Sequence, residues 1–302
     1  MADTSSGSPE PEQGASGGPG RGPEHEGPEQ GHTGHSERPE EPMPKIDSSV
    51  PHSARIFTYW LGGKDHFPVD EEAGERVREI FPAIVDLARV GRYFLGRVVR
   101  YLVQDAGVTQ FLDVGTGLPT VDNTHEVAQR LDPRCRVVYV DNDPLVLAHA
   151  EALLTSTPEG RTHYLEADVR DPERILSEAR GILDFDQPVA VFLMGILAHV
   201  DDLTEAQSIV RRLMDGLPAG SYLSVRDGAD TDPAYLAAIE GYNASGAVPY
   251  RLRSPEEIAR FFEGLELVEP GVVPCPQWRP EAEDPFASPD DVALYGGLAR
   301  KR

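Results

Sequence analysis

The sequence has little of several features that mark common classes of protein. Only two of its 302 residues are cysteines, Cys135 and Cys275, and their spacing matches no metal motif. Basic residues are few, with 28 lysines and arginines against 51 acidic residues and a net charge of −23. Because nucleic-acid binders gain most of their affinity by replacing phosphate counterions with cations, this balance argues against DNA or RNA as a partner.

Long apolar runs are also missing. The longest, residues 188–200, is shorter than the roughly 18 residues that a membrane helix needs. The amino terminus has no basic stretch followed by an apolar one, so the sequence predicts neither a secretory signal nor a membrane partner. Together with the low cysteine content, this favours a protein of the reducing cytoplasm.

Residues 1–45 contain no aromatic residue and no valine, leucine or isoleucine. Such a segment, rich in Gly, Pro, Glu and Ser, cannot bury enough apolar surface to offset roughly 1–2 kcal/mol of backbone entropy per ordered residue. It carries nine acidic and three basic residues and is predicted to be a disordered acidic tail. Its histidines, His25, His32 and His35, lack a ligand spacing and predict no metal site.

Strand and helix patterns alternate from residue 109 onward. This alternation predicts an α/β fold with a parallel sheet. The sequence predicts further extended segments near 265–273 and 291–299, which would close the sheet. The five expected parallel strands lie near residues 109–114, 135–141, 162–167, 188–194 and 220–225.

Three helices are expected ahead of the sheet, at residues 53–61, 69–80 and 83–104. The first is rich in aromatic side chains and ends at Gly62 and Gly63, which suits a hinged cover over a reacting centre. Simple packing on the sheet explains it equally well. The predicted organisation is a tail of residues 1–45, a helical cover of residues 46–105 and an α/β domain of residues 106–302.

The most informative segment is residues 111–117, FLDVGTG, in which two glycines follow an apolar strand. Gly115 and Gly117 permit positive φ and a close approach of a ligand to the backbone. Asp113, just before this turn, suits a cationic ligand better than a pyrophosphate. Asp141 ends the next strand, where a carboxylate can accept hydrogen bonds from both hydroxyls of a ribose. The two strand ends predict a nucleoside site.

Two features of the following residues bear on the kind of cofactor. The dinucleotide fingerprint requires a third glycine where this chain has Thr120, so a nicotinamide-dependent oxidoreductase is the weaker alternative. Asn123 and Glu126 form a capping-box pattern, and Pro144 after Asp143 is typical of a helix start, so these residues are predicted to begin the first and second crossover helices.

Residues 117–120 (GLPT), 123–128 (NTHEVA) and 139–141 (YVD) resemble a bacterial family of S-adenosylmethionine-dependent methyltransferases that was first catalogued as a domain of unknown function. The resemblance implies a class I methyltransferase fold: a Rossmann-like, mostly parallel, seven-stranded sheet with helices on both faces. It implies S-adenosylmethionine as the cofactor and names no acceptor. It extends to residues 51–56, 61–65, 167–172, 267–272 and 278–280, and covers nearly everything after residue 46.

In such a site, Asp113 would hold the ammonium group of the cofactor, the glycines would face its methionine portion and Asp141 its ribose. Asp168 follows the third strand and, as in similar methyltransferases, would read the adenine edge together with the amide of Val169. Its alternative role is that of a turn or N-cap acid ahead of Pro172. The other candidates for cofactor binding are Asn142, Met194, Gly195 and Tyr59.

Methyl transfer depends mainly on alignment, which can supply roughly 7–11 kcal/mol, so the absence of a catalytic triad or metal cluster is no objection. His199, one short turn after the fourth strand, is the best candidate for a base, although histidines at strand ends are commonly structural. His52 and Asp65 are weaker catalytic candidates. Trp278 and Tyr242 are candidates for an acceptor pocket or for ordinary packing.

Four arginines, at positions 89, 92, 97 and 100, lie along one side of the third predicted helix. We expect a solvated face that pairs with glutamates of the preceding helix rather than a functional patch. The sequence as a whole predicts a cytoplasmic methyltransferase that acts on a small molecule. A sensor that binds S-adenosylmethionine or its demethylated product without turnover remains the alternative.

Overall fold

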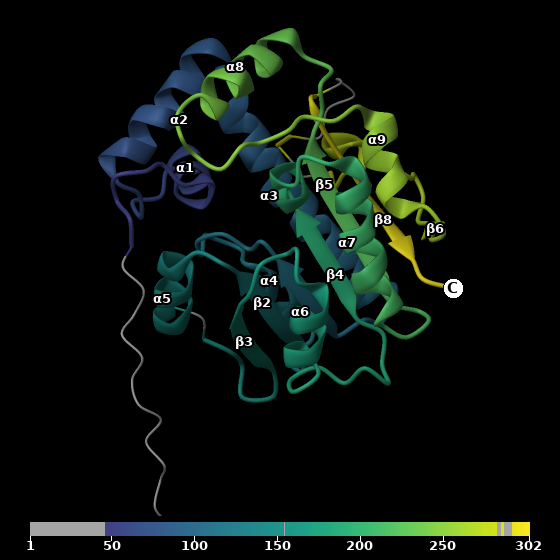
Figure 1. Ribbon diagram of the computed structural model, residues 1–302. Helices are drawn as coiled ribbons and strands as arrows, with labels where there is room; N and C mark the ends of the chain where they lie inside the picture. Colours follow the sequence, from purple (N-terminus) through teal and green to yellow (C-terminus); the bar gives the residue numbers. More distant parts are fainter. Residues whose placement is uncertain (1–45, 154, 283–284, 287–291) are drawn as a thin grey trace, which may run out of the picture. The chain divides into compact units, whose positions relative to one another are not determined.

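A mixed sheet runs through the molecule between two layers of helices (Figure 1). The computed structural model describes residues 46–153, 155–282, 285–286 and 292–302. The strands are β1 (Gln110–Val114), β2 (Arg136–Asp141), β3 (Arg161–Glu166), β4 (Ala190–Met194), β5 (Tyr222–Gly228), β6 (Glu266–Leu267), β7 (Val273–Pro274) and β8 (Leu294–Arg300). The α-helices are α1 (Ser53–Trp60), α2 (Pro68–Ile80), α3 (Ile84–Gln104), α4 (Thr124–Leu131), α5 (Pro144–Leu153), α6 (Pro172–Ala179), α7 (Leu203–Asp215), α8 (Pro233–Asn243) and α9 (Pro255–Ala259).

The strand order is β3-β2-β1-β4-β5-β8-β6, and β7 also pairs with β8. Strands β1 to β5 are parallel and β8 is antiparallel to β5, which confirms the predicted class I methyltransferase fold. The seventh strand of the predicted sheet is divided into two short strands, β6 and β7, which pair with different parts of β8. Pro270 lies between them and has no N–H to donate to a ladder.

Both faces of the sheet are buried, as expected for parallel strands. Side chains alternate along β1: Phe111 belongs to the core that contains Phe94 of α3, and Leu112 to the core that contains Ile175 of α6 and Ile209 of α7. Figure 1 shows α7 in front of the sheet and α3 behind it. The crossover helices begin where predicted, since Glu126 accepts from the Asn123 amide at 2.7 Å and Asp143 from the Leu145 amide at 2.9 Å.

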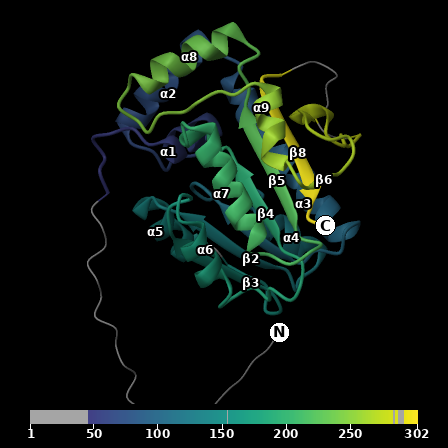
Figure 2. The same ribbon diagram turned by 45° about the vertical axis from the view of Figure 1, so that its right-hand side comes forward.

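Helices α1, α2 and α8 gather beyond the carboxyl ends of the parallel strands, as both ribbon views show (Figures 1 and 2). Helix α2 packs against α1 and α8, and Phe81 after α2 stacks on Tyr235 of α8 with ring centroids 4.9 Å apart. Helix α3 instead packs on β4 and β8. The division of the chain after residue 105 stays a prediction, and the predicted tail of residues 1–45 lies outside the described residues.

The arginines of α3 do not form the single solvated face that we predicted. Arg97 is buried, and its Nε donates to the carbonyl of Trp278 at 2.9 Å. Arg89 pairs with Asp86 and Arg100 with Glu281, whereas two glutamates of α2, Glu72 and Glu75, pair with arginines of that helix. The reason is that α3 is a layer of the core, so its arginines reach partners on several sides.

Trp278 belongs to the core and not to an acceptor pocket. Its side chain is fully buried and packs edge-on against Phe94, with centroids 5.6 Å apart, and against Tyr101. No helix in the described part of the chain combines the length and the apolarity needed to cross a membrane.

Candidate active site

A cavity of about 220 Å³ opens at the carboxyl ends of the parallel strands, between the sheet and helices α1, α3 and α8. The strand order places residues after β1, β2 and β3 on one side of it and residues of β4, β5 and α8 on the other. The first side is polar and contains Asp113, Gly115, Thr116, Gly117, Asp141, Asn142, Asp168 and Val169. The second side is mostly aromatic and aliphatic and contains Met194, Tyr235, Ile239, Tyr242 and, in the segment after α8, Tyr250. Apolar residues of α1 and α3 also line the cavity: Phe57, Trp60, Leu87 and Leu95.

Asp113 lies at the floor of the polar side and is only 6% exposed. Its Oδ2 accepts a hydrogen bond from Thr124 Oγ1 at 2.6 Å. Burial raises the pKa of Asp113 to about 6, although the Thr124 hydrogen bond and the nearby Arg92 oppose that rise. A cation placed against Asp113 would favour its ionised form, so this carboxyl is suited to a positively charged ligand.

The two glycines adopt the positive φ that the sequence predicts, 75° at Gly115 and 65° at Gly117. At Gly115 the group that comes close to the backbone is the side chain of Ile196, which the sequence did not predict. A Cβ at position 115 would lie 2.5 Å from the Cβ of Ile196. Gly117 donates its amide to Asp141 Oδ2 at 2.8 Å and so ties the turn to the end of β2.

Backbone amides hold the Asp141 carboxylate in place. Besides Gly117, the amides of Asn142 and Asp143 donate to its Oδ1 at 2.9 and 3.1 Å. A carboxylate has about four lone-pair directions, so roughly one remains free on Oδ2. Burial raises the pKa of Asp141 against the effect of these amides. In this arrangement it can accept one ribose hydroxyl directly rather than the two that we expected.

Asp168 has the turn role that the sequence left open, and its role at the adenine edge stays a prediction. Its Oδ1 accepts from the Arg170 amide at 2.8 Å, which makes it a turn acid, and Asp171 rather than Asp168 caps α6. The side chain also lines the cavity, where Asn142 Nδ2 donates to its Oδ2 at 3.3 Å.

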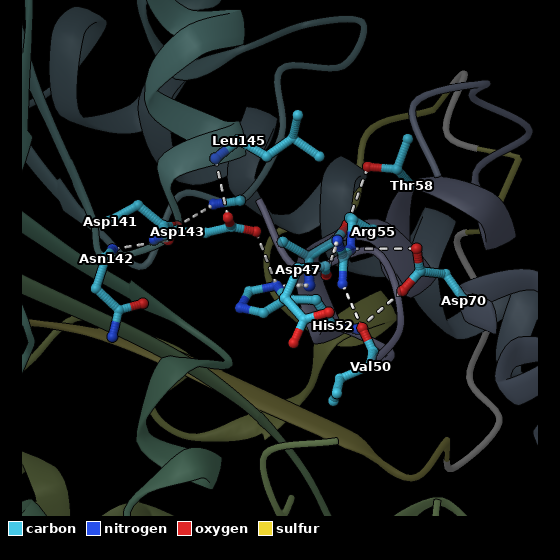
Figure 3. A network of polar contacts seen from close by, with 12 residues as sticks. Asp47, Val50, His52, Arg55, Thr58, Asp70, Asp141, Asn142, Asp143 and Leu145 are labelled. Atoms are coloured by element: carbon cyan, nitrogen blue, oxygen red, sulfur yellow. Dashed lines mark hydrogen bonds and ion pairs between the residues drawn. The ribbon is translucent and has the colours of Figure 1, made fainter. Parts of the chain in front are cut away.

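A polar network joins the start of α1 to this edge of the sheet (Figure 3). The His52 amide donates to Asp70 Oδ1 at 2.8 Å, and Arg55 Nε pairs with Asp70 Oδ2 at 3.1 Å. His52 Nδ1 lies 3.2 Å from Asp143 Oδ2. Helix α1 is thereby seated over the turn that follows β2, and His52 lines the cavity.

Two predicted site residues do not line the cavity. Tyr59 donates its hydroxyl to Glu75 of α2 and packs edge-on against His66, because it lies on the side of α1 that faces α2. Asp65 is exposed and lies 4.0 Å from His149, so its place is on the outer surface. All other predicted cofactor-binding and catalytic residues line the cavity.

His199 ends a short 3-10 helix, Ile196–His199, directly after β4. Its Nδ1 lies 2.9 Å from the carbonyl of Pro249, which can only accept, so Nδ1 carries the proton. In the neutral ring Nε2 is therefore the basic nitrogen. Burial lowers the pKa of His199, and its ring packs edge-on against Tyr250 with centroids 5.3 Å apart.

Arg253 holds the segment that carries His199. It is fully buried and donates to the carbonyls of Leu197, at 2.9 Å, and Val200. Its Nη1 also lies 3.5 Å from Oδ2 of Asp227, which is fully buried as well. The position of His199 thus depends on a side chain more than 50 residues away in the sequence.

Sequence patterns assigned no function to two arginines that line the cavity, Arg92 and Arg226. Arg92 was grouped with the other arginines of its helix, and Arg226 lies one residue beyond the expected end of the fifth strand. The signal that could have identified Arg226 as a site residue is its position, as a basic residue directly after a predicted apolar strand. No cluster of metal-ligating side chains occurs in the part of the chain that the structure describes.

Comparison with known proteins identifies the family. Residues 39–302 match the family model described as S-adenosyl methyltransferase. The fold is similar to that of a DUF574 family protein from Streptomyces avermitilis, with 46% identity, a TM-score of 0.81, and 85% of this chain and 100% of that one covered. A candidate methyltransferase from Thermobifida fusca is similar too, with 42% identity, a TM-score of 0.78, and coverage of 85% and 97%. No curated protein matches. The chain belongs to the S-adenosyl methyltransferase family, as its motifs predicted, and uses S-adenosylmethionine as its cofactor.

Proposed function

We propose that the chain transfers the methyl group of S-adenosylmethionine to a small molecule bound on the aromatic side of the cavity. One observation carries the proposal: a single cavity joins the acidic, glycine-containing edge of β1, β2 and β3 to an apolar chamber beside His199. The aromatic and aliphatic side chains around that chamber suit the apolar or aromatic body of a small molecule rather than a nucleic acid. The two cysteines are free and buried, which supports a reducing compartment, the cytoplasm.

The residues on the polar side fit the parts of the cofactor. Asp113 would bind the ammonium group and Asp141 a ribose hydroxyl, while Asn142, Asp168 and Val169 would surround the adenine. The methionine carboxylate needs a cation beside Asp113. Arg92 supplies one, since it lines the cavity, interacts with Asp113 and has no hydrogen-bond acceptor for Nε among the described residues.

Bound S-adenosylmethionine supplies an electrophilic methyl group, and the protein supplies alignment and a proton acceptor. Met194 and Gly195, at the end of β4, lie where the polar and aromatic sides meet. His199 Nε2 would take the proton of an acceptor hydroxyl or amine as the new bond forms. Helix α1, with Phe57 and Trp60 in the cavity wall, would exclude water from this space.

Calorimetry with S-adenosylmethionine, S-adenosylhomocysteine and NAD tests the cofactor: the first two should bind and NAD should not. Family membership already disfavours the nicotinamide alternative. Incubation of the protein and methyl-labelled donor with small-molecule and macromolecular fractions of cell extract then tests turnover. Label in the small-molecule fraction supports the proposal. Binding without label transfer in any fraction would support the sensor alternative.

Replacing Asp141 by alanine should weaken S-adenosylmethionine binding about 10- to 150-fold, because a hydrogen bond to a charged group contributes roughly 1.5–3 kcal/mol. Calorimetry measures the loss directly. Asp132→Ala is the matched control, since Asp132 ends α4 away from the cavity and pairs with Arg134. Unchanged affinity in Asp141→Ala would remove this residue from the site.

Cofactor affinity should rise with pH between 5 and 7. Because the pKa of Asp113 is raised to about 6, the group is mostly protonated at pH 5 and mostly ionised at pH 7. Only the ionised form attracts the ammonium group, so affinity should increase up to about tenfold over this range. Calorimetry at several pH values measures the rise, and Asp113→Asn should make it smaller. An equally steep rise in Asp113→Asn would assign it to another group.

A further inference from the structure

Arg226 is a buried cation with fewer hydrogen bonds to the protein than Arg253 or Arg97. It lies in β5, is 8% exposed and lines the cavity. Its Nη2 donates to the carbonyl of Met194 at 3.0 Å, and its Nε has no hydrogen-bond partner among the described residues. The neighbouring carboxylate, Asp227, forms its direct ion pair with Arg253, and the charge of Arg226 acts on it without a direct contact.

Arg253 and Arg97 show what a structural arginine looks like in this molecule. Arg253 binds two carbonyls and a carboxylate, and Arg97 binds the carbonyls of Trp278 and Cys275. A guanidinium has five donors, so one backbone carbonyl leaves most of the capacity of Arg226 unused.

The guanidinium packs closely against α3 at Gly91. A Cβ at Gly91 would lie 3.2 Å from the Arg226 Cζ, so a larger residue there would displace the guanidinium. Gly91 is inside α3, where glycine destabilises a helix relative to alanine, so a packing reason is needed for it. The ring of Phe57 in α1 lies 5.9 Å from the guanidinium carbon and forms an apolar wall beside it.

Arg226 and Asp113 come from different strands, although the charge of Arg226 acts on both Asp113 and Arg92. Asp113, Met194 and Arg226 occupy the same face of three adjacent strands, with β4 between β1 and β5. Asp113 and Arg92 are on the β1 side, where the methionine ammonium and carboxylate would bind. Arg226 comes from β5, and its guanidinium lies at the end of β4, against Met194 and near the ring of Phe57 on the aromatic side.

We propose that Arg226 binds a carboxylate of the methyl acceptor, which makes the acceptor a small aromatic or alicyclic acid. This rests on the proposed function and names its substrate class. The planar fork of a guanidinium matches a carboxylate, and the attraction is strong where water is excluded. The apolar lining from Phe57, Tyr235, Ile239 and Tyr242 would contact the body of the acid.

The test uses full-length protein saturated with S-adenosylhomocysteine. Benzoate, phenylacetate and 3-phenylpropionate are titrated by calorimetry beside their uncharged amides. The wild type should bind at least one acid about tenfold or more tightly than its amide. Arg226→Gln should bind that acid about 10- to 150-fold more weakly than the wild type does, and its affinity for the amide should be unchanged. Arg76→Gln, at an exposed arginine of α2, controls for loss of charge and should change nothing.

S-adenosylmethionine affinity, measured on the same variants, separates the possible failures. In Arg226→Gln it should stay within about threefold of the wild type. If it falls at least tenfold while the preference for acids persists, Arg226 binds the cofactor and the inference is wrong. Equal binding of acids and amides, or no binding of either, by a wild type that binds S-adenosylmethionine also overturns it and leaves the methyltransferase proposal intact. A wild type that does not bind S-adenosylmethionine would refute both.

Arg226→Lys provides the test if the glutamine variant fails to fold. Lysine keeps the charge and loses the planar fork. It should therefore weaken acid binding about tenfold, leave amide binding unchanged and preserve cofactor affinity. Acid affinity equal to that of the wild type would show that the planar fork is not used, and would overturn the assignment of a carboxylate.

Discussion

Replacing His199 by asparagine is expected to lower turnover about 10²- to 10⁴-fold, the usual contribution of a general base. Asparagine can still donate from its amide to the carbonyl of Pro249, but it has no counterpart of the imidazole Nε2. The measurement is the rate at which label passes from the methyl donor into the small-molecule product of a cell extract. Cofactor affinity should stay within about threefold, because His199 is placed beside the acceptor and not the nucleoside.

His163→Asn is the matched control, since His163 lies exposed on β3, and it should leave turnover unchanged. A loss below tenfold in His199→Asn would argue against the base. The pH profile adds a second readout. Burial lowers the pKa of His199 from its usual 6.5, so the wild-type rate should rise with pH below that value and level off before pH 7. The asparagine variant should lack this rise.

The parts of the fold that were predictable from the sequence are those set by local patterns. The buried runs that became β1 and β2 end within one residue of the predicted bounds, because apolar strands between turn residues are a short-range signal. The capping box at Asn123 is equally local. Asp113 and Asp141 met at one edge because parallel strands align their carboxyl ends, and this follows from connectivity alone.

The missed features depend on contacts between distant segments. Nothing near His199 in the sequence indicates that Pro249 orients its ring or that Arg253 holds its turn, and both partners are at least 50 residues away. Tyr59 does not line the cavity as predicted, for a related reason. The packing of α2 decides which side of α1 faces the cavity, and the Tyr59 hydroxyl donates a hydrogen bond to Glu75 of α2. A short helix with aromatic residues on several sides does not reveal its inner face.

The ion pair of Arg253 and Asp227 should prove costly to break from one side. Both residues are fully buried, and Arg253→Met would leave the Asp227 carboxylate without its direct ion-pair partner. Removing one partner of such a pair typically destabilises a protein by about 3–5 kcal/mol. Denaturant unfolding at pH 7 measures the loss. Arg251→Met, at an exposed arginine two residues away, should change stability by less than about 0.5 kcal/mol.

The same variant should recover part of its stability as the pH falls from 7 to 5. Burial raises the pKa of Asp227 to about 6 even with Arg253 present, whereas an unfolded aspartate titrates near 3.9. Over this range the folded state therefore takes up a proton that the unfolded state does not, and protonation of Asp227 stabilises the folded state. The double variant Asp227→Asn with Arg253→Met should lose less stability than Arg253→Met alone and should lack the recovery. A loss in the double variant as large as in the single one would mean that Arg253 stabilises the fold through the carbonyls of Leu197 and Val200 rather than through the ion pair.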